Sequence, residues 1–286
     1  MPVINTNVNS IVSQNATNRT DRSLTPTMEK LSTGYRINKS GDDAAGLAVS
    51  TKMRSQIRGT NQAARNISDA VAMVQTADGA LREVSAIMQR MRELAVQGAT
   101  ETYSTDDLAL MDTEYQQLES EITRIVEQTK WNRMDLLNGY GPGATSGSSG
   151  EFIIQLGADN GQTMTVTIGN LQINSATTGA ILSDLDGLSV SSQASSAAAI
   201  TGIDNAFTDL ADKRADLGAY MNRLGNALGN AEIFSANMSD SESRIRDTDY
   251  AKEMTEFARA QIVRQAGMAM LSQANAIPSQ ILQILQ

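Results

Sequence analysis

Apolar side chains in the first half of the chain recur at alternating steps of four and three residues, which is the spacing of a heptad seam. The seam is unbroken and comprises Ala63, Ile67, Ala70, Val74, Ala77, Leu81, Val84, Met88, Met91, Ala95 and Gly98. A helix of this length is too long for a round core, so we expect partner helices of similar length.

Two further seams supply such partners. One is opened by Ser104 or Thr105 as N-cap, with Asp106 and Asp107 in the first turn, where acidic groups favour a helix. It comprises Leu108, Met111, Tyr115, Leu118, Ile122 and Ile125. The other comprises Ile200, Ile203, Phe207, Leu210, Leu217, Met221, Leu224, Leu228 and Ala231, with Arg214 interrupting it. Two early helices and one late helix predict an antiparallel bundle.

The segment between the second and third seams has a different pattern. Residues 138–150, NGYGPGATSGSSG, are typical of an irregular loop. The apolar run 152–156 and the alternating residues 163–168 flank the turn residues 159–161, which predicts a β-hairpin. Residues 170–196 are rich in Ser, Thr, Gly and Ala and are expected to form loops with at most one short strand.

Both ends of the chain carry helical apolar stripes, and the outermost part of each end lacks charge. No charged side chain precedes Arg19 or follows Arg264. The stripe positions are Ile4, Val8 and Ile11 at one end, and Met254, Phe257, Ile262, Met270, Leu271, Ile277, Ile281 and Leu285 at the other. A neutral amphipathic helix suits a site enclosed by protein, because buried unpaired charges are costly. An isolated end buries one stripe at most, so several copies are needed to order it. The alternative is a pair of ordinary frayed termini.

These patterns predict a mainly α fold, in which a terminal helix pair adjoins a long antiparallel heptad bundle with a small β-hairpin region. We expect three parts. Residues 1–43 with 241–286 form the terminal helices, residues 44–139 with 197–240 form the bundle, and residues 140–196 form the hairpin and loops.

Composition excludes several classes of function. The chain has no cysteine and no histidine, which removes thiolate nucleophiles, imidazole acid–base chemistry and Cys/His zinc sites. We expect no catalytic residue, no enzyme activity and no cofactor. A net charge of -9 disfavours nucleic acid, and no apolar run is long enough to span a membrane. Asp184 and Asp186 before Gly187 faintly resemble a calcium loop, but a plain turn is the simpler interpretation and no metal site is predicted.

Several segments closely resemble bacterial flagellins. They are INTNVNSIVSQNATNRT at 4–20, LSTGYRIN at 31–38, DDAAGLAVS at 42–50, QRMRELAVQ at 89–97, WNRMDLLNG at 131–139 and SQANAIPSQILQILQ at 272–286. They occur in the same order as in that family, and residues 140–195 fall where flagellins vary most.

The resemblance implies a structural subunit that self-polymerises into a helical homopolymer, the extracellular flagellar filament, for swimming motility. Terminal helices would form an inner tube, and the bundle with the hairpin an outer tube. The implied partners are the flagellar type III export apparatus, a flagellin chaperone, the filament cap and the hook-associated proteins. This export route agrees with the amino terminus, where no secretory signal is expected. A hook–filament junction protein of the same apparatus is the alternative.

The segment at 89–97 also resembles the flagellin patch that a host Toll-like receptor recognises on monomers. By that resemblance, Arg90 and Leu94 with Glu114 would form the contact, and Gln89, Glu93 and Gln97 would complete it. On the heptad frame Leu94 lies off the seam, so it is expected to face outward. The alternative is that this patch serves only as a contact between subunits.

Overall fold

The computed structural model describes residues 6–139, 150–173 and 180–284, of which the last few are described by backbone alone. It divides into two compact units, and each is treated separately below. Unit 1 consists of Met1–Ser55 and Ala236–Gln286, and unit 2 of Gln56–Ser235. Helix α2 (Ala44–Gly98) and helix α4 (Gln193–Arg246) contribute residues to both units.

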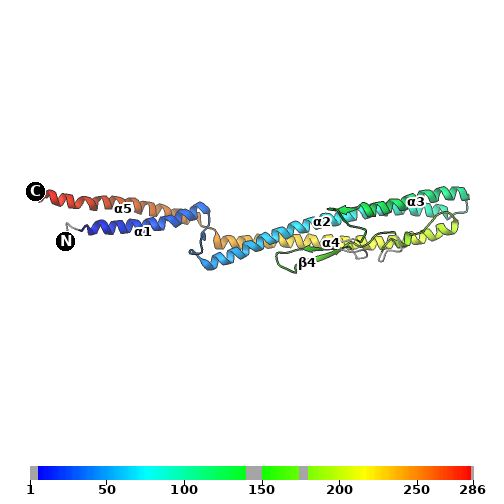
Figure 1. Cartoon of the computed structure of the whole chain (residues 1–286), viewed down its shortest axis with the longest axis horizontal. Helices are drawn as coiled ribbons and strands as arrows, with labels where there is room; N and C mark the ends of the chain where they lie inside the picture. The colour runs from blue at the N-terminus through cyan, green and yellow to red at the C-terminus, as the bar shows by residue number, and fades with distance from the viewer. Residues whose placement is uncertain (1–5, 140–149, 174–179, 285–286) are drawn as a thin grey trace. The chain divides into compact units, whose positions relative to one another are not determined.

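Unit 1 contains a helix pair formed by the two ends of the chain. Helix α1 (Val8–Thr33) packs against α5 (Tyr250–Ile284), shown in blue and red in Figure 1. The pair is antiparallel, because Ser10 hydrogen-bonds Asn275 at 2.8 Å near one end while Lys30 lies 3.5 Å from Glu253 near the other. Helix α1 ends at Gly34, whose φ of 75° places it in the left-handed conformation that glycine adopts without strain.

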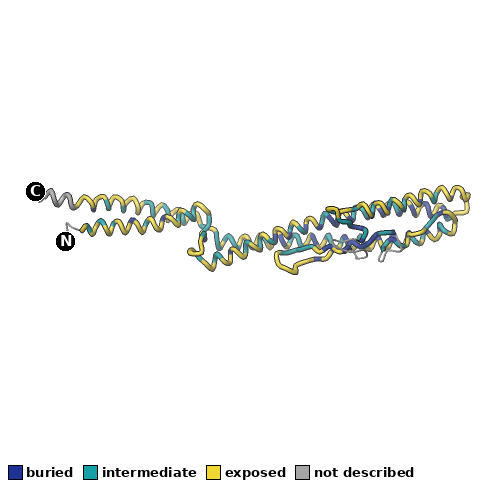
Figure 2. The backbone as a smooth tube through the Cα atoms, viewed as in Figure 1, coloured by how far each residue is buried: buried dark blue, intermediate teal, exposed yellow. Residues whose placement is uncertain are grey.

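Unit 2 is a three-helix bundle that confirms the heptad seams. It packs α3 (Thr105–Gln128) with the unit 2 parts of α2 and α4 around one apolar core. Figure 2 shows the buried positions recurring along these helices. Every residue of the long α2 seam is buried. Ser104 is the N-cap of α3, in a capping box with Asp107. Arg214, which interrupts the α4 seam, pairs with Asp78 of α2 at 3.0 Å.

The predicted hairpin is also confirmed. Strand β3 (Glu151–Gln155) pairs antiparallel with β4 (Thr163–Thr167), in the register Phe152 opposite Val166. The sequence did not indicate a second pair, β1 (Lys130–Trp131) with β2 (Met134–Asp135). The turn residues of this pair, Asn132 and Arg133, have positive φ. The sequence did not indicate the turn, because non-glycine residues seldom adopt positive φ. A short 3-10 helix, η1 (Ser183–Leu185), precedes α4.

Candidate interaction surfaces

The terminal helices of unit 1 leave many large apolar side chains exposed. Of the predicted stripe positions whose side chains are described, six are exposed: Val8, Ile11, Met254, Ile262, Met270 and Ile277. Phe257 and Leu271 are half-buried. Ile4, Leu285 and the side chain of Ile281 lie outside the described residues. Ile262 is 67% exposed, which is unusual for an isoleucine in a helix of a solitary soluble domain.

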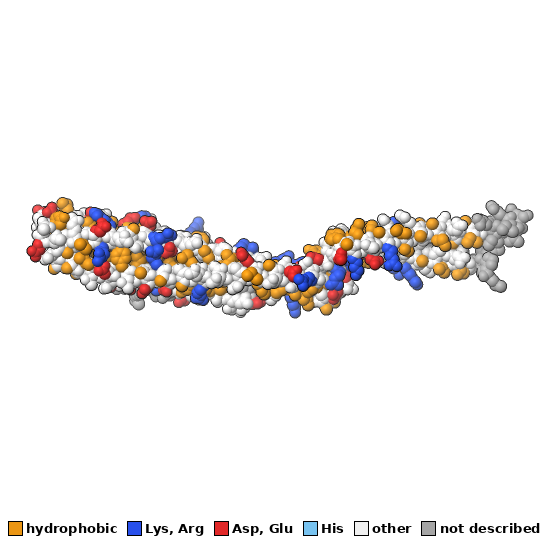
Figure 3. All heavy atoms as spheres, turned by 180° about the vertical axis from the view of Figure 1, so that it is seen from behind, with side chains coloured by type: hydrophobic (Ala, Val, Ile, Leu, Met, Phe, Trp, Pro, Cys, Tyr) orange, Lys and Arg blue, Asp and Glu red, His pale blue; other side chains and the backbone are white. Residues whose placement is uncertain are grey.

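These apolar residues are not confined to one side of α5. Met268 and Met270 are both exposed although they point about 200° apart around a helix axis. No charged side chain follows Arg264 in the sequence, and the Arg264 guanidinium lies 4.0 Å from Asp21 of α1. Figure 3 shows hydrophobic atoms mixed with uncharged polar and backbone atoms, and few charged ones, on the face of unit 1 near the described chain ends. A helix that is apolar on several sides is typical of one enclosed by protein.

Uncharged polar groups set the register between α1 and α5. The Asn7 side-chain amide donates to the Ala274 carbonyl at 2.8 Å. A Cβ at Gly267 would lie 2.8 Å from the Thr17 hydroxyl oxygen, so glycine permits the close approach of the two helices there. Near the chain ends the pair is therefore held by contacts that require no charge, whereas the ion pair of Lys30 with Glu253 lies near the other end of the pair.

A cluster around Tyr35 joins two connections of unit 1, the one between α1 and α2 and the one between α4 and α5. The Arg246 and Arg54 guanidinium carbons lie 4.3 Å and 5.9 Å from the centre of the Tyr35 ring, within cation–π range. The Arg54 guanidinium also contacts Glu242 at 2.7 Å. The Arg36 backbone N–H donates to the Arg246 carbonyl at 2.6 Å. Sequence reasoning missed this cluster, because its members are about 200 positions apart and follow no periodic pattern.

The structure brings several of the predicted receptor-patch residues together on unit 2. The Arg90 guanidinium donates to Glu114 at 2.8 and 2.9 Å and to Glu93 at 3.2 Å. The hydrogen bonds that Arg90 donates to Glu114, and then to Glu93, raise the pKa of Arg90. The Gln97 amide donates to the Tyr103 hydroxyl at 2.9 Å, and Gln89 is exposed beside Arg90. These residues form an exposed polar surface across α2 and α3.

Leu94 corrects the expectation for that patch. It was expected to face outward, but its side chain is 2% exposed and belongs to the bundle core. The physical reason is that α2 packs against two helices rather than one. A helix in a three-helix core needs an apolar face wider than the two positions per heptad of a simple seam. Met73, which lies beside the seam residue Val74, is also buried, and it lines the same small pocket as Trp131 and Met134 of the β1–β2 pair.

A loop crosses the exposed side of α3 next to several carboxylates. The Val190 N–H donates to Asp112 at 2.7 Å, and the Gln116 amide donates to the Leu188 carbonyl at 3.2 Å. Burial, and then the neighbouring carboxylates of Asp186 and Asp112, raise the pKa of Glu119. Within the described ranges, no group of three or more acidic side chains is placed to hold a metal ion, and that includes Asp184.

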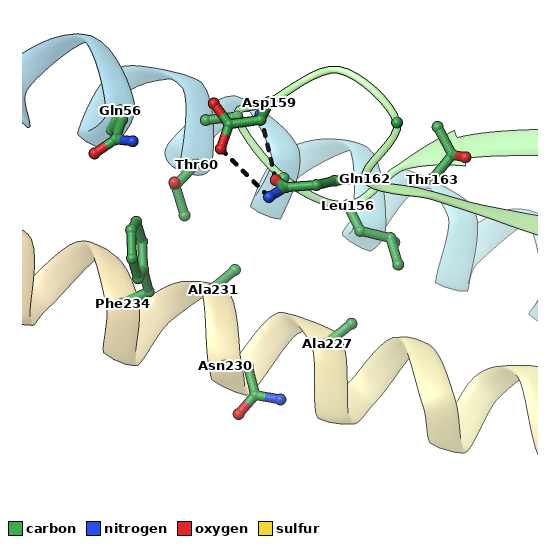
Figure 4. A pocket seen from close by; sticks show the side chains of 13 residues that line it. Gln56, Thr60, Leu156, Asp159, Gln162, Thr163, Ala227, Asn230, Ala231 and Phe234 are labelled. Carbon is green, nitrogen blue, oxygen red and sulfur yellow. Dashed lines mark hydrogen bonds between the residues drawn. The ribbon is translucent and has the colours of Figure 1, made fainter. Parts of the chain in front are cut away.

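A groove of about 490 Å³ lies between the hairpin turn and the helices of unit 2, shown in Figure 4. Its walls include Leu156, Ala227 and Phe234, and Gln162 bonds Asp159 at its edge. Among the described residues that line it, Asp159 alone is titratable. Such a lining offers neither a nucleophile with a base nor a pair of carboxylates for acid–base chemistry.

No helix in the described part of the chain is long and apolar enough to cross a membrane.

Comparison with known proteins identifies the family. The bacterial flagellin N-terminal helical region matches residues 4–141, and the bacterial flagellin C-terminal helical region matches residues 200–285. A flagellin of Halalkalibacterium halodurans is 43% identical over 91% of this chain and 90% of its own length. A flagellar filament 31.3 kDa core protein of Treponema maltophilum is 40% identical over 99% of this chain and 100% of its own.

Among solved structures, the chain resembles a crystal structure of Bacillus cereus flagellin, with 31% identity and a TM-score of 0.48. That match covers 58% of this chain and 88% of the other. The two regional matches together span well over half of the chain, and the relatives align along almost their whole length. The chain therefore belongs to the bacterial flagellin family.

Proposed function

We propose that the chain, as a structural subunit of the flagellar filament, polymerises mainly through the helix pair α1 and α5. The observation that carries this proposal is the exposure of large apolar side chains on several sides of α5, whose residues beyond Arg264 carry no charge. Covering those side chains with neighbouring copies removes apolar area from water, and it leaves few charges to be buried unpaired.

The three parts expected from the sequence take different places in the proposed filament. Residues 1–43 with 241–286 form its inner layer, and residues 44–139 with 197–240 form the outer layer together with the hairpin region 140–196. The composition is consistent with an enclosed inner layer at its extremities, because residues 1–18 and 265–286 carry no charged side chain. The two units of the structure divide the chain after Ser55 and before Ala236, which is near the proposed boundaries between the inner and outer layers.

Delivery and assembly then require the partners of the flagellar apparatus. The chain is exported through the flagellar type III system, with a chaperone covering the carboxyl-terminal helix until it folds beneath the filament cap. Hook-associated proteins bound the polymer, which lies outside the cell. The exposed apolar side chains of α5 support a role for a chaperone, because such a surface exposed in the cytoplasm would associate prematurely.

The experiment that tests the assembly surface is seeded elongation of Ile262→Asn, with Ile262→Leu as the matched control. Because the side chain is 67% exposed in the solitary chain, its loss leaves folding intact. Burying it at a subunit contact is worth about 1 to 2 kcal/mol, so the asparagine variant should bind the seed about tenfold more weakly. Sedimentation of filaments measures this. Equal elongation by both variants contradicts the proposal at this position.

The alternative function is a hook–filament junction protein. Both functions use helical ends that associate with copies of the same chain, so the length of the polymer separates them. A filament subunit elongates seeds to micrometre length in electron micrographs, whereas a junction protein stops at a short ring. We favour the filament subunit because near full-length relatives include a flagellin and filament core proteins.

We further propose that the surface around Arg90 and Glu114 is recognised on the monomer by a host Toll-like receptor. The polar members Gln89, Glu93 and Gln97 complete it, and Leu94 supports it from the core. Arg90→Ala should weaken receptor activation in a cell reporter assay. Arg124→Ala is the matched control, because Arg124 is also exposed and paired with an acidic neighbour on its own helix. Equal activation by the two variants would show that this surface serves only contacts between subunits.

A further inference from the structure

The methionines of this chain are sorted by exposure between the two units. Four of the described methionines are more than half exposed, and all four belong to unit 1: Met28, Met254, Met268 and Met270. Four are buried, and all belong to unit 2: Met73, Met88, Met91 and Met164. The remaining described methionines are half-buried. We name the first group the exposed methionine set.

The exposed methionine set lies among the apolar residues that carry the proposed assembly surface. Ile262 and Val263 are exposed on the same helix, and Val12 is exposed on α1. A thioether suits such a surface, because it is apolar and its flexible chain adapts to the partner that covers it. The same sulfur is the site where the surface can be changed chemically, because exposed thioethers are open to oxidants.

We propose that the exposed methionine set is an oxidation site that controls whether the monomer can assemble. The inference rests on the proposed function of α1 and α5. The oxidant is hydrogen peroxide or another two-electron oxidant of the same class. The sulfur lone pair attacks one peroxide oxygen, the O–O bond breaks and an S–O bond forms. The thioether becomes a sulfoxide, and the other peroxide oxygen leaves as water after taking up one proton.

The oxidised side chain no longer matches the surface. A sulfoxide oxygen is a strong hydrogen-bond acceptor, and much of its surroundings here is apolar. Burying the sulfoxide oxygen at a subunit contact without a hydrogen-bond donor costs free energy, as it does for any unpaired buried polar group. The equilibrium constant for adding a subunit to a filament end should therefore fall about tenfold or more. Unit 2 should keep its fold, because its core methionines are shielded.

The sorting by exposure makes the first test direct. Monomer is treated with hydrogen peroxide, and peptide mass spectrometry maps the sulfoxides. The exposed methionine set should be oxidised several-fold faster than the buried methionines. The treated monomer should elongate seeds about tenfold more slowly. Methionine sulfoxide reductases should restore elongation, since they reduce both sulfoxide epimers.

Two further arms locate the effect. In preformed filaments the exposed methionine set should be protected from peroxide relative to the monomer. A variant carrying Met28→Leu, Met254→Leu, Met268→Leu and Met270→Leu should elongate normally, because leucine conserves the apolar volume, and it should resist peroxide. A control variant with Met111→Leu, Met134→Leu and Met221→Leu, all half-buried in unit 2, should stay sensitive.

The outcomes separate this inference from the function on which it rests. Untreated protein that fails to elongate seeds overturns the proposed function itself. Untreated and fully oxidised protein that elongate equally well overturn the oxidation site alone, as does oxidation of the set in filaments at the monomer rate. If the quadruple leucine variant itself fails to elongate seeds, the inference is tested by whether the reductases restore elongation by the oxidised parent protein. Failure of that restoration counts against the site.

Discussion

Replacing Leu94 by alanine is the sharpest test of the bundle core, because its sequence position suggested a surface residue. The side chain is 2% exposed and belongs to the same core cluster as Met91, Tyr115 and Ile203. Leu94→Ala removes three carbon groups, each worth about 0.8 kcal/mol in transfer free energy. The cavity left behind raises the total loss to about 2 to 5 kcal/mol.

The assay is thermal unfolding followed by circular dichroism. For a unit spanning residues 56–235, each kcal/mol lowers the midpoint by about 2 to 4 °C, so a fall of roughly 4 to 20 °C is expected. Leu94→Met conserves volume and should cost less than about 1.5 kcal/mol. Arg90→Ala, at an exposed ion pair, should leave the midpoint almost unchanged. A Leu94→Ala midpoint equal to that of the parent protein would show that the side chain faces solvent. Receptor assays on Leu94 variants therefore need this control.

Three further predictions concern α3 and its surroundings. Ser104→Ala removes the capping box and should cost about 1 kcal/mol, a fall of about 2 to 4 °C in the unfolding midpoint. Tyr115→Phe should leave the midpoint unchanged or higher, because the Tyr115 hydroxyl is buried with no partner among the described residues, and a clear fall in the midpoint would reveal one. The raised pKa of Glu119 means that the native state binds the carboxyl proton more tightly than the unfolded state, in which the pKa of Glu119 is near 4.5. Stability is therefore lost as pH rises from that value through the native pKa. Glu119→Gln should raise the midpoint at pH 7 but not below pH 4, and an equal effect at both would contradict the reasoning.

The sequence was informative wherever a periodic pattern met a simple packing rule. The seam from Ala63 to Ala95 predicted the buried face of α2, and Ser104 with its acidic first turn predicted the start of α3. The alternation in residues 163–168 predicted a strand, and the turn residues at 159–161 predicted its partner. The division into three parts, the assembly stripes and the receptor surface remain predictions.

The sequence was misleading where the number of neighbours decided the outcome. Leu94 lies off the two-position seam, so a two-helix model places it outside. It is buried because the core of unit 2 also covers that side of α2. The turn at Asn132 and Arg133 was missed because its positive φ values occur at residues that seldom adopt them.

The amino-acid sequence by itself determined the helix periods, the neutral ends, the hairpin and, through its motifs, the resemblance to flagellins. These features are local, because propensity, capping and periodicity act over a few residues. The tertiary structure alone decided that Leu94 is in the core, that Arg90 bonds Glu114, and that Tyr35 lies within cation–π range of Arg54 and Arg246. Such contacts join residues distant in sequence, so they depend on which helices pack together and at what register, and no short-range pattern encodes that choice.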